Sequence, residues 1–294
     1  MAATGSPVAV RSSILVAATL CLTAIAIGPG GDPVHAQGEA GAMPLAPHRA
    51  VYDLKLKEAH GQRSLQSARG RIVYDFSGTA CDGYTLKFRQ VTELDSGEGK
   101  IAVSDLRSET WEEGAARSFR FASQSYTNEE LVDAVDGRAQ RGANGVTADL
   151  VKPSRKTVEL GDVVFPAQHM RRVIATARAG TTLVEQPIFD RSETGEKVYN
   201  TLTVIGRQIA PEARPLTDVT AKEPVLVAMA RWPVTISYFD RGKAGEAGEQ
   251  TPVYSIKFEL FENGISRAIL LDYGDFSIAG EMTSLDLKEP KPCK

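Results

Sequence analysis

The stretch SIKFELFENGISRAILLDY, residues 255–273, decides the fold class of this chain. Apolar and polar residues alternate on both sides of Asn263-Gly264, a residue pair that suits the tight turn of a β-hairpin. The same two-residue period returns towards the N-terminus in RAVYDLKL (49–56) and YTLKFRQVTEL (84–94). Glycine-rich or acidic turns separate these segments, so the pattern predicts a mostly β protein with antiparallel strands.

One segment departs from this period. Between Phe165 and Gly180 the apolar residues recur at helical spacing, with Pro166 near the first turn and the glycine just past the last one. We therefore expect one main helix at about 166–179, lying against the sheet. The alternating segments number about a dozen, and no repeat of 20–50 residues is visible. A single domain over residues 48–294 is the simplest arrangement.

The first 36 residues differ from the rest. Arg11 is the one charge before the apolar run ILVAATLCLTAIAI (14–27), and small residues follow at Val34 and Ala36. A short apolar core of this kind predicts a signal peptide that is cleaved between Ala36 and Gln37. A short membrane anchor that stays attached is the alternative. Lipidation of Cys21 is excluded, because Leu20 precedes it where a small residue is required.

Residues 37–47 form a small-residue leader that we expect to be poorly ordered. Beyond the signal peptide the chain has two cysteines, Cys81 and Cys293. In an oxidising compartment two cysteines commonly form one disulfide, although free thiols or a bridge to another chain remain open. No CxxC motif is present, which argues against a redox catalyst.

Composition and motifs give little support for an enzyme or a nucleic-acid-binding protein. The chain of 294 residues is 42% hydrophobic and 24% charged, with a net charge of −3 and no visible basic stripe. His48, His60 and His169 show no metal-ligand spacing, and no nucleophile elbow or phosphate-binding loop occurs. We expect His169 to lie on a solvated basic face. Asp105 and Glu109 share a strand face, as the two carboxylates of a glycosidase would. Acidic residues on one strand face more commonly lie on the solvent-exposed side of a sheet.

Two groups of aromatic residues are the remaining binding candidates. A buried core is the plain interpretation, and an apolar groove for a lipid-like ligand is the sharper one. The candidate groove residues are Trp111, Phe119, Phe121, Trp232 and Tyr238.

Four segments together resemble the EipB family of exported cell-envelope integrity proteins from alphaproteobacteria. They are HRAVYDLKL (48–56), CDGYTLKF (81–88), ARWPVTISYFD (230–240) and NGISRAILLDYGDFSIAGEMTSLDL (263–287). The resemblance implies a periplasmic protein whose strands coil into an antiparallel β-spiral, or broken barrel. It also implies a disulfide between Cys81 and Cys293, a tetratricopeptide-repeat partner protein, and neither catalytic activity nor a cofactor.

Three functions follow as hypotheses. The first is a non-enzymatic periplasmic protein that maintains the envelope by binding a protein partner, for which open sheet edges are suited. The second is a carrier or sensor of acyl chains in a concave apolar groove. The third, a hydrolase of envelope polymers, lacks a visible catalytic constellation.

Overall fold

The computed structural model describes residues 44–60, 65–97, 101–243 and 250–289, which fall into one compact unit. All of its named strands belong to one antiparallel sheet. Eight strands precede the main helix: β1 (His48–Ala59), β2 (Ser67–Thr79), β3 (Gly83–Asp95), β4 (Ile101–Glu112), β5 (Ser118–Thr127), β6 (Glu130–Gly142), β7 (Gly145–Lys152) and β8 (Lys156–Gly161).

The main helix, α1 (Pro166–Arg178), follows β8, and a short helix, α2 (Pro224–Val227), comes later. Six strands complete the sheet: β9 (Leu183–Ile188), β10 (Tyr199–Ile205), β11 (Arg231–Asp240), β12 (Tyr254–Phe261), β13 (Ser266–Asp272) and β14 (Phe276–Leu287). The sequence-based fold is confirmed: antiparallel β structure, with the main helix at the expected place. The sheet has fourteen strands where about a dozen were expected.

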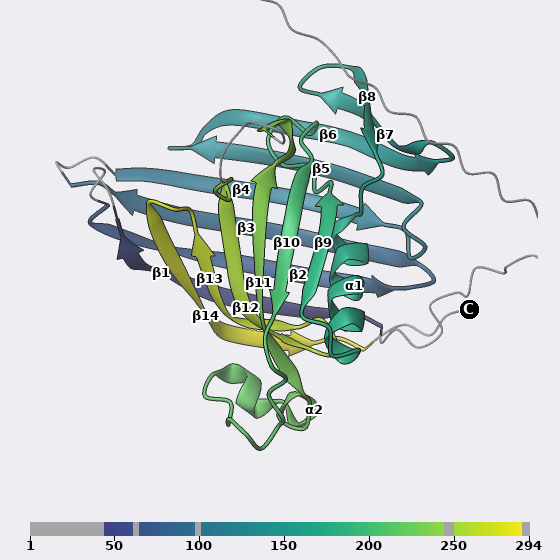
Figure 1. Ribbon diagram of the computed structural model, residues 1–294. Helices are drawn as coiled ribbons and strands as arrows, with labels where there is room; N and C mark the ends of the chain where they lie inside the picture. The colour runs from purple at the N-terminus through teal and green to yellow at the C-terminus, as the bar shows by residue number, and fades with distance from the viewer. Residues whose placement is uncertain (1–43, 61–64, 98–100, 244–249, 290–294) are drawn as a thin grey trace, which may run out of the picture. The chain divides into compact units, whose positions relative to one another are not determined.

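The order of the strands explains why the sheet stays open. From β1 the chain moves outward one strand at a time to β8, crosses through α1, and starts again at β9. It then moves inward until β14 pairs with β1, so the two free edges are β8 and β9. Figure 1 shows the consequence: β9–β13 lie across the long strands β2–β6, with α1 beside β9.

One face of the sheet is buried, because side chains alternate along each strand. In β1 the buried residues are His48, Ala50, Tyr52 and Leu54, while Arg49 and Lys55 between them are exposed. The buried face packs into three apolar clusters. The first cluster joins β2 and β3 to α1 and β9–β12. The second joins β5–β8 to the residues just before α1 and just after β9. The third joins β1 and β2 to β12–β14. We call this side of β1–β8 the inner face, and the opposite side the outer face.

The hairpin at residues 255–273 forms as predicted. Gly264 has φ of +88°, and the Gly264 N–H donates to the Phe261 carbonyl over 3.0 Å. A Cβ on Gly264 would lie 2.7 Å from the side chain of Leu45, so glycine is needed for space as well as for conformation.

That contact corrects the expected boundary of the leader. Leu45 is 5% exposed and belongs to the first core cluster, and the Ala46 N–H donates to the Asn263 carbonyl over 2.8 Å. The ordered fold therefore already includes residues 44–47, because Leu45 finds an apolar partner that the local sequence does not show. The rest of the leader, the signal peptide and its cleavage site at Ala36 and Gln37 lie outside the described residues.

Helix α1 begins on a buried carboxylate. Its N-cap position, Phe165, has no side chain that could accept from the helix. The carboxylate of Glu112 on β4 does so instead, accepting the N–H of Ala167 over 2.6 Å and that of Gln168 over 2.7 Å. Burial raises the pKa of Glu112 to about 7, and the two backbone donors only partly oppose that rise.

We expect Glu112→Gln to lower the free energy of unfolding by about 1–2 kcal/mol at pH 5. The neutral acid present at that pH keeps a hydroxyl oxygen that can accept the second N–H, whereas an amide nitrogen cannot. The deficit should shrink as the pH rises to 8. A folded-state pKa above the unfolded value means that wild type loses stability as pH rises through this range, and glutamine does not titrate. Urea unfolding at both pH values, with the exposed Glu185→Gln as control, checks this; a deficit that grows with pH would contradict it.

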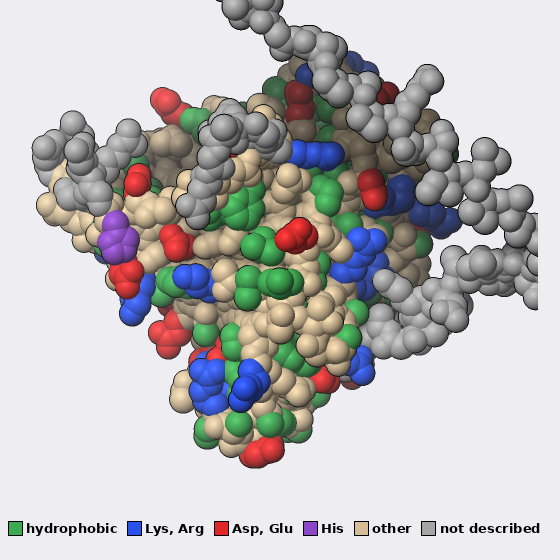
Figure 2. All heavy atoms as spheres, viewed as in Figure 1, with side chains coloured by type: hydrophobic (Ala, Val, Ile, Leu, Met, Phe, Trp, Pro, Cys, Tyr) green, Lys and Arg blue, Asp and Glu red, His purple; other side chains and the backbone are tan. Residues whose placement is uncertain are grey.

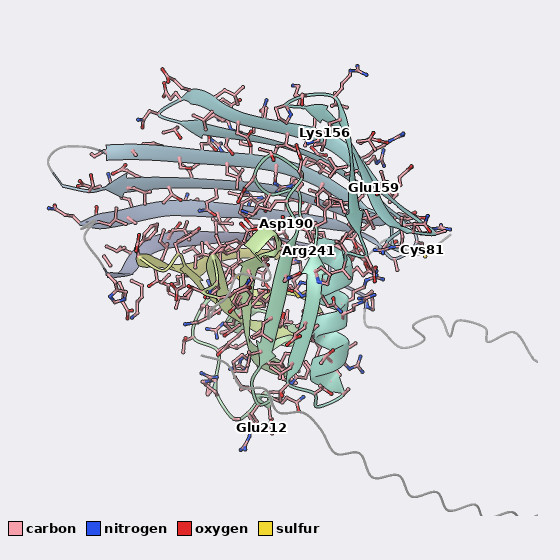
Figure 3. The ribbon with its side chains drawn as sticks, turned by 45° about the horizontal axis from the view of Figure 1, so that its top comes forward. Cys81, Lys156, Glu159, Asp190, Glu212 and Arg241 are labelled. Atoms are coloured by element: carbon pink, nitrogen blue, oxygen red, sulfur yellow. The ribbon has the colours of Figure 1, made fainter. Side chains whose placement is uncertain are left out.

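The two free edges approach each other at one end. Val164 forms an isolated parallel bridge with Ile188: the Val164 N–H donates to Pro187, and the Phe189 N–H donates to Val164. Arg241 just beyond β11 donates to the Leu160 carbonyl on β8 over 3.2 Å. Figure 3 labels Arg241, together with Lys156 and Glu159 on the exposed edge strand β8.

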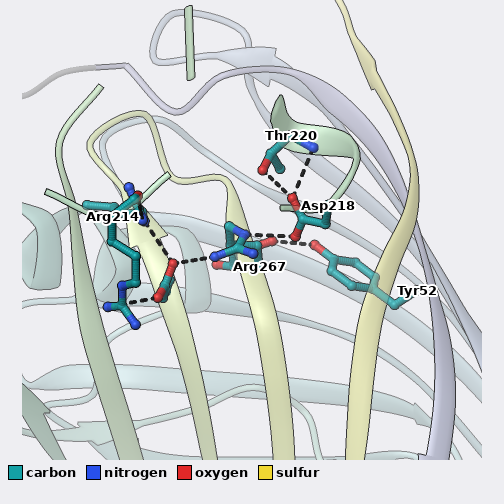
Figure 4. Close-up of polar contacts among 8 residues, drawn as sticks. Tyr52, Arg214, Asp218, Thr220 and Arg267 are labelled. Atoms are coloured by element: carbon teal, nitrogen blue, oxygen red, sulfur yellow. Dashed lines mark hydrogen bonds and ion pairs between the residues drawn. The ribbon is translucent and has the colours of Figure 1, made fainter. Parts of the chain in front are cut away.

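A buried charge network holds the segment between β10 and β11 against the strands (Figure 4). Arg231, 1% exposed, donates to Glu259 over 2.8 Å and to the Arg214 carbonyl over 2.6 Å. Arg267 donates to Glu259 over 2.5 Å and to Asp218 over 2.7 Å. Glu259 is therefore shared by two buried guanidinium groups, with a third contact to the Arg214 side chain at 3.1 Å.

Within the described residues, no helix has the length and apolarity needed to cross a membrane.

Candidate functional site

The five aromatic residues of the predicted groove do not come together. Phe119 and Phe121 lie in the second core cluster, whereas Trp232 and Tyr238 lie in the first. All four are at most 8% exposed. Trp111 is half-buried on the outer face of β4.

Of the three histidines, His169 is placed differently from the sequence expectation. His169 is not on a solvated face: it is 2% exposed, and its Nε2 lies 3.4 Å from the Thr203 hydroxyl. It precedes Val173 by one helical turn and shares the buried face of α1, where burial lowers its pKa to about 4. His48 is also buried and stacks on Tyr74 at 5.4 Å between ring centroids. His60 lies 3.2 Å from Glu58 at the surface.

The carboxylates that share a face of β4 are engaged separately. Asp105 accepts from Arg89 and from Arg107, and these guanidinium groups lower its pKa to about 2. Glu109 lies 3.8 Å from Lys87. Each carboxylate thus has cations beside it, which is the arrangement of a surface ion-pair array. Among the residues with described positions, no cluster of His, Cys, Asp and Glu could hold a metal ion.

Cys81 lies in the turn between β2 and β3, where its N–H donates to the Thr79 hydroxyl over 3.2 Å (Figure 3). Cys293 falls outside the described residues, so the predicted pair stays a prediction.

The largest concave feature among the hollows found lies on the outer face. Residues between β3 and β8 line an open hollow of about 1120 Å³, and an adjoining open hollow of about 610 Å³ extends to β1 and β2. The two share Glu109, Ala122 and Asp136 in their linings. We call them together the outer groove.

The register of the sheet explains how the outer groove is built. One row of facing residues runs across the strands from Arg49 through Asp75, Lys87 and Glu109 to Ala122. It continues through Asp136 to Lys152. In the neighbouring row Thr85 faces Trp111, Trp111 faces Arg120, and Arg120 faces Arg138. The exposed methyl group of Ala122 is the smallest side chain in the first row, and it leaves the floor of the groove open between longer charged neighbours.

Basic residues dominate the lining although the whole chain carries a net charge of −3. The acidic residues are Asp75, Glu109, Asp136 and Asp149. The larger hollow has the basic residues Arg120, Arg138, Arg155 and Lys156. The smaller hollow has Arg49, Lys87, Arg89, Arg107 and Lys152.

Trp111 and Arg120 form the most defined part of the groove. The guanidinium carbon of Arg120 lies 4.2 Å from the centre of the Trp111 ring, and the indole N–H donates to the Asp82 carbonyl over 3.2 Å. The ring is thereby fixed at its polar edge and covered on one face by a cation. Tryptophan and arginine are the residue types most enriched where protein interfaces hold most of their binding energy.

A second exposed surface lies on the segment that holds α2. Val225 and Val227 are 49% and 47% exposed there. Figure 2 shows hydrophobic, basic and acidic side chains mixed over this lower projection, with no continuous apolar patch. The outer groove is therefore the stronger candidate site.

The comparisons with known proteins agree on one family. A model of the EipB-like family matches residues 39–289. The cell envelope integrity protein EipB of Brucella abortus (strain 2308) is 37% identical over 254 residues, which cover 86% of this chain and 88% of that protein. A crystal structure of a β-barrel-like protein with a domain of unknown function, also from Brucella abortus, superposes with a TM-score of 0.77 at 37% identity. It covers 84% of this chain and 100% of the other.

The match spans the whole described fold, from the residues before β1 to the end of β14, and includes every strand that lines the outer groove. This chain belongs to the EipB-like family.

Proposed function

We propose that this protein maintains the integrity of the cell envelope by binding a protein partner in the outer groove, without catalysing a reaction. The name of the Brucella relative, cell envelope integrity protein, supports the role in the envelope. The observation that carries the proposed mode of action is the hollow of about 1120 Å³ beside Trp111, whose indole ring is held in place under Arg120. A fixed aromatic ring and several guanidinium groups around a concavity are typical of a protein-binding surface.

The partner expected from the family resemblance is a periplasmic tetratricopeptide-repeat protein. The test uses the purified repeat protein from the same genome and the mature chain, with binding measured by biolayer interferometry. Ala122→Trp should weaken binding at least tenfold, because the indole fills the floor of the groove without altering its charge. Aromatic side chains are well tolerated on exposed strand positions, and the melting temperature checks that the variant folds.

Ser284→Trp is the matched control. Ser284 is also exposed on a strand, in β14, and does not line the groove. Equal affinities for the two tryptophan variants would contradict the proposed site, and no binding of the repeat protein by wild type would contradict the proposed partner.

Carriage of acyl chains has less support. The inner face is packed by α1 and by the aromatic residues of the second core cluster. Native mass spectrometry of the mature protein recovered gently from the periplasm tests this alternative. We expect a single chain that lacks residues 1–36 and two protons; an adduct of lipid mass would favour the carrier.

Export and the disulfide belong to the same proposal. β14 ends beside β1, and Lys288 at its end lies 2.5 Å from Asp75 on β2. Four further residues lead from Glu289 to Cys293, and they can span about 13 Å. Leu287 and Phe76 both face His48 on β1, so β14 ends level with the last residues of β2. This register supports a bridge to Cys81, which lies in the turn that follows β2.

Cys293→Ser and Cys81→Ser should each lower the free energy of unfolding by about 2–4 kcal/mol, since the bridge restricts the unfolded chain over a long loop. Folding should persist, because a sheet of this size supplies most of the stability. Thermal melts and limited proteolysis under oxidising conditions check this. Unchanged melting of both variants would contradict the bridge.

A further inference from the structure

We infer that the segment bound in the outer groove is acidic, and that its carboxylates are held by Arg120 and Arg155 at the larger hollow and by Arg49 at the smaller one. This inference rests on the proposed function, because it names the chemistry of the partner for the same groove. It goes further by assigning the specificity to three guanidinium groups.

The first argument is which cations of the groove are already paired. Arg89 and Arg107 share Asp105 at 2.9 and 2.7 Å. Lys156 lies 2.7 Å from Glu196, and Arg138 lies 3.6 Å from Asp149. These pairs are satisfied within the protein, so they add little to the attraction for a ligand.

Other cations of the groove have no such partner. Across the described part of the chain, no ion pair is made by Arg49, Arg120, Lys152 or Arg155, and all four are exposed. Lys152 faces Asp136 across the β6–β7 pair, so that cation has an acidic neighbour. Arg49, Arg120 and Arg155 remain as exposed cations without a carboxylate of their own in this part of the chain. Asp75 faces Arg49, but it is engaged by Lys288.

The second argument is the form of these groups. A guanidinium presents its N–H donors in a planar fork that matches the two oxygens of a carboxylate. Arg120 is also held in position by the ring of Trp111, at 4.2 Å, so less side-chain freedom is lost when it binds. A preorganised cation of this kind favours one defined carboxylate over diffuse anionic charge.

The third argument excludes a uniform polyanion. Glu109 and Asp136 line both hollows, and Asp149 lines the larger one between Arg138 and Thr157. A chain with a negative charge on every unit would bring some of that charge close to these carboxylates, which is repulsive. An acidic protein segment can instead place separate carboxylates opposite the arginines, and neutral residues opposite Glu109, Asp136 and Asp149.

The test uses three fluorescein-labelled probes and the folded mature chain. The first is a 20-residue peptide with five spaced glutamates, the second has lysines at the same positions, and the third is polyphosphate of similar charge. Fluorescence anisotropy is measured in low salt and in high salt. We expect the glutamate peptide to bind best and to weaken as salt is added, because exposed charges are screened.

The double variant Arg120→Gln, Arg155→Gln should bind the glutamate peptide about tenfold more weakly, which is the effect of losing two exposed charge pairs. The matched control is Lys55→Gln, Lys57→Gln, which removes the same charge from exposed positions of β1 outside the groove. It should bind the peptide like wild type. Circular dichroism melts confirm that both variants fold.

The inference would be overturned by equal binding of the glutamate and lysine peptides, by tighter binding of polyphosphate than of the glutamate peptide, or by equal losses in the two double variants. Failure to bind the glutamate peptide at millimolar concentration would overturn it as well. The proposed function is judged separately by the repeat protein and Ala122→Trp. Loss of that binding in Ala122→Trp, together with unchanged binding in the arginine variant, would keep the groove and reject the acidic partner.

Discussion

Replacing Glu259 with alanine should lower the free energy of unfolding by about 3–5 kcal/mol, the largest effect expected for a single charged residue in this protein. The carboxylate accepts from Arg231 and from Arg267, which are 1% and 8% exposed. Burial by itself would raise the pKa of Glu259, but the two arginine donors outweigh it and lower the pKa overall. Alanine would leave two buried guanidinium groups without their shared anion.

Equilibrium urea unfolding of Glu259→Ala checks this expectation. Glu259→Gln keeps the shape and one acceptor but removes the charge, so it should fall between wild type and alanine. Glu281→Ala is the control: Glu281 is exposed on β14 and should change stability by less than about 0.5 kcal/mol. A cost for Glu259→Ala no larger than that of the control would show that the buried network contributes no net stability.

Replacing Phe189 with alanine should also cost about 3–5 kcal/mol, in this case through the cavity that it leaves. Phe189 is fully buried and follows the edge strand β9. Its ring meets Phe119 and Phe121 edge-on, at 6.2 and 5.5 Å between centroids. It therefore packs the end of β9 against β5, so it connects the β9–β14 part of the open sheet to the β1–β8 part.

Leu183→Ala is the matched control for Phe189→Ala. Leu183 begins the same strand but is 55% exposed, so its truncation should have little effect on stability. Thermal and chemical unfolding of both variants give the comparison. A cost below about 1 kcal/mol for Phe189→Ala would mean that neighbouring side chains fill the cavity. Other contacts would then hold the β1–β8 part of the sheet to the β9–β14 part.

The sequence predicted the elements well because their signals are local. The alternation around Asn263-Gly264 and the helical spacing after Pro166 are set by neighbouring residues, and both elements form where they were expected. Local patterns could not indicate which distant residues each side chain meets. For that reason the leader with Leu45 was expected to be poorly ordered and His169 to be solvated, although both residues are buried.

The candidate site was missed for a related reason. Arg49, Lys87 and Arg120 are 38 and 33 residues apart along the chain, so no basic stripe is visible in the sequence. Strand register brings them to one face: Asp75 separates Arg49 from Lys87, and Trp111 faces Arg120. The predicted aromatic groove was wrong for a different reason. Its residues were chosen by type, and all but Trp111 became ordinary core.

The sequence by itself determined the secondary structure and the antiparallel character of the sheet. These follow from periodicity, turn chemistry and the burial of apolar side chains, which act over a few residues. Only the tertiary structure decided that β1 pairs with β14, that Glu112 supports α1, and that the basic residues of β1–β8 gather in one groove. Those features depend on pairing between distant strands, and no local pattern encodes which strand becomes the neighbour of another.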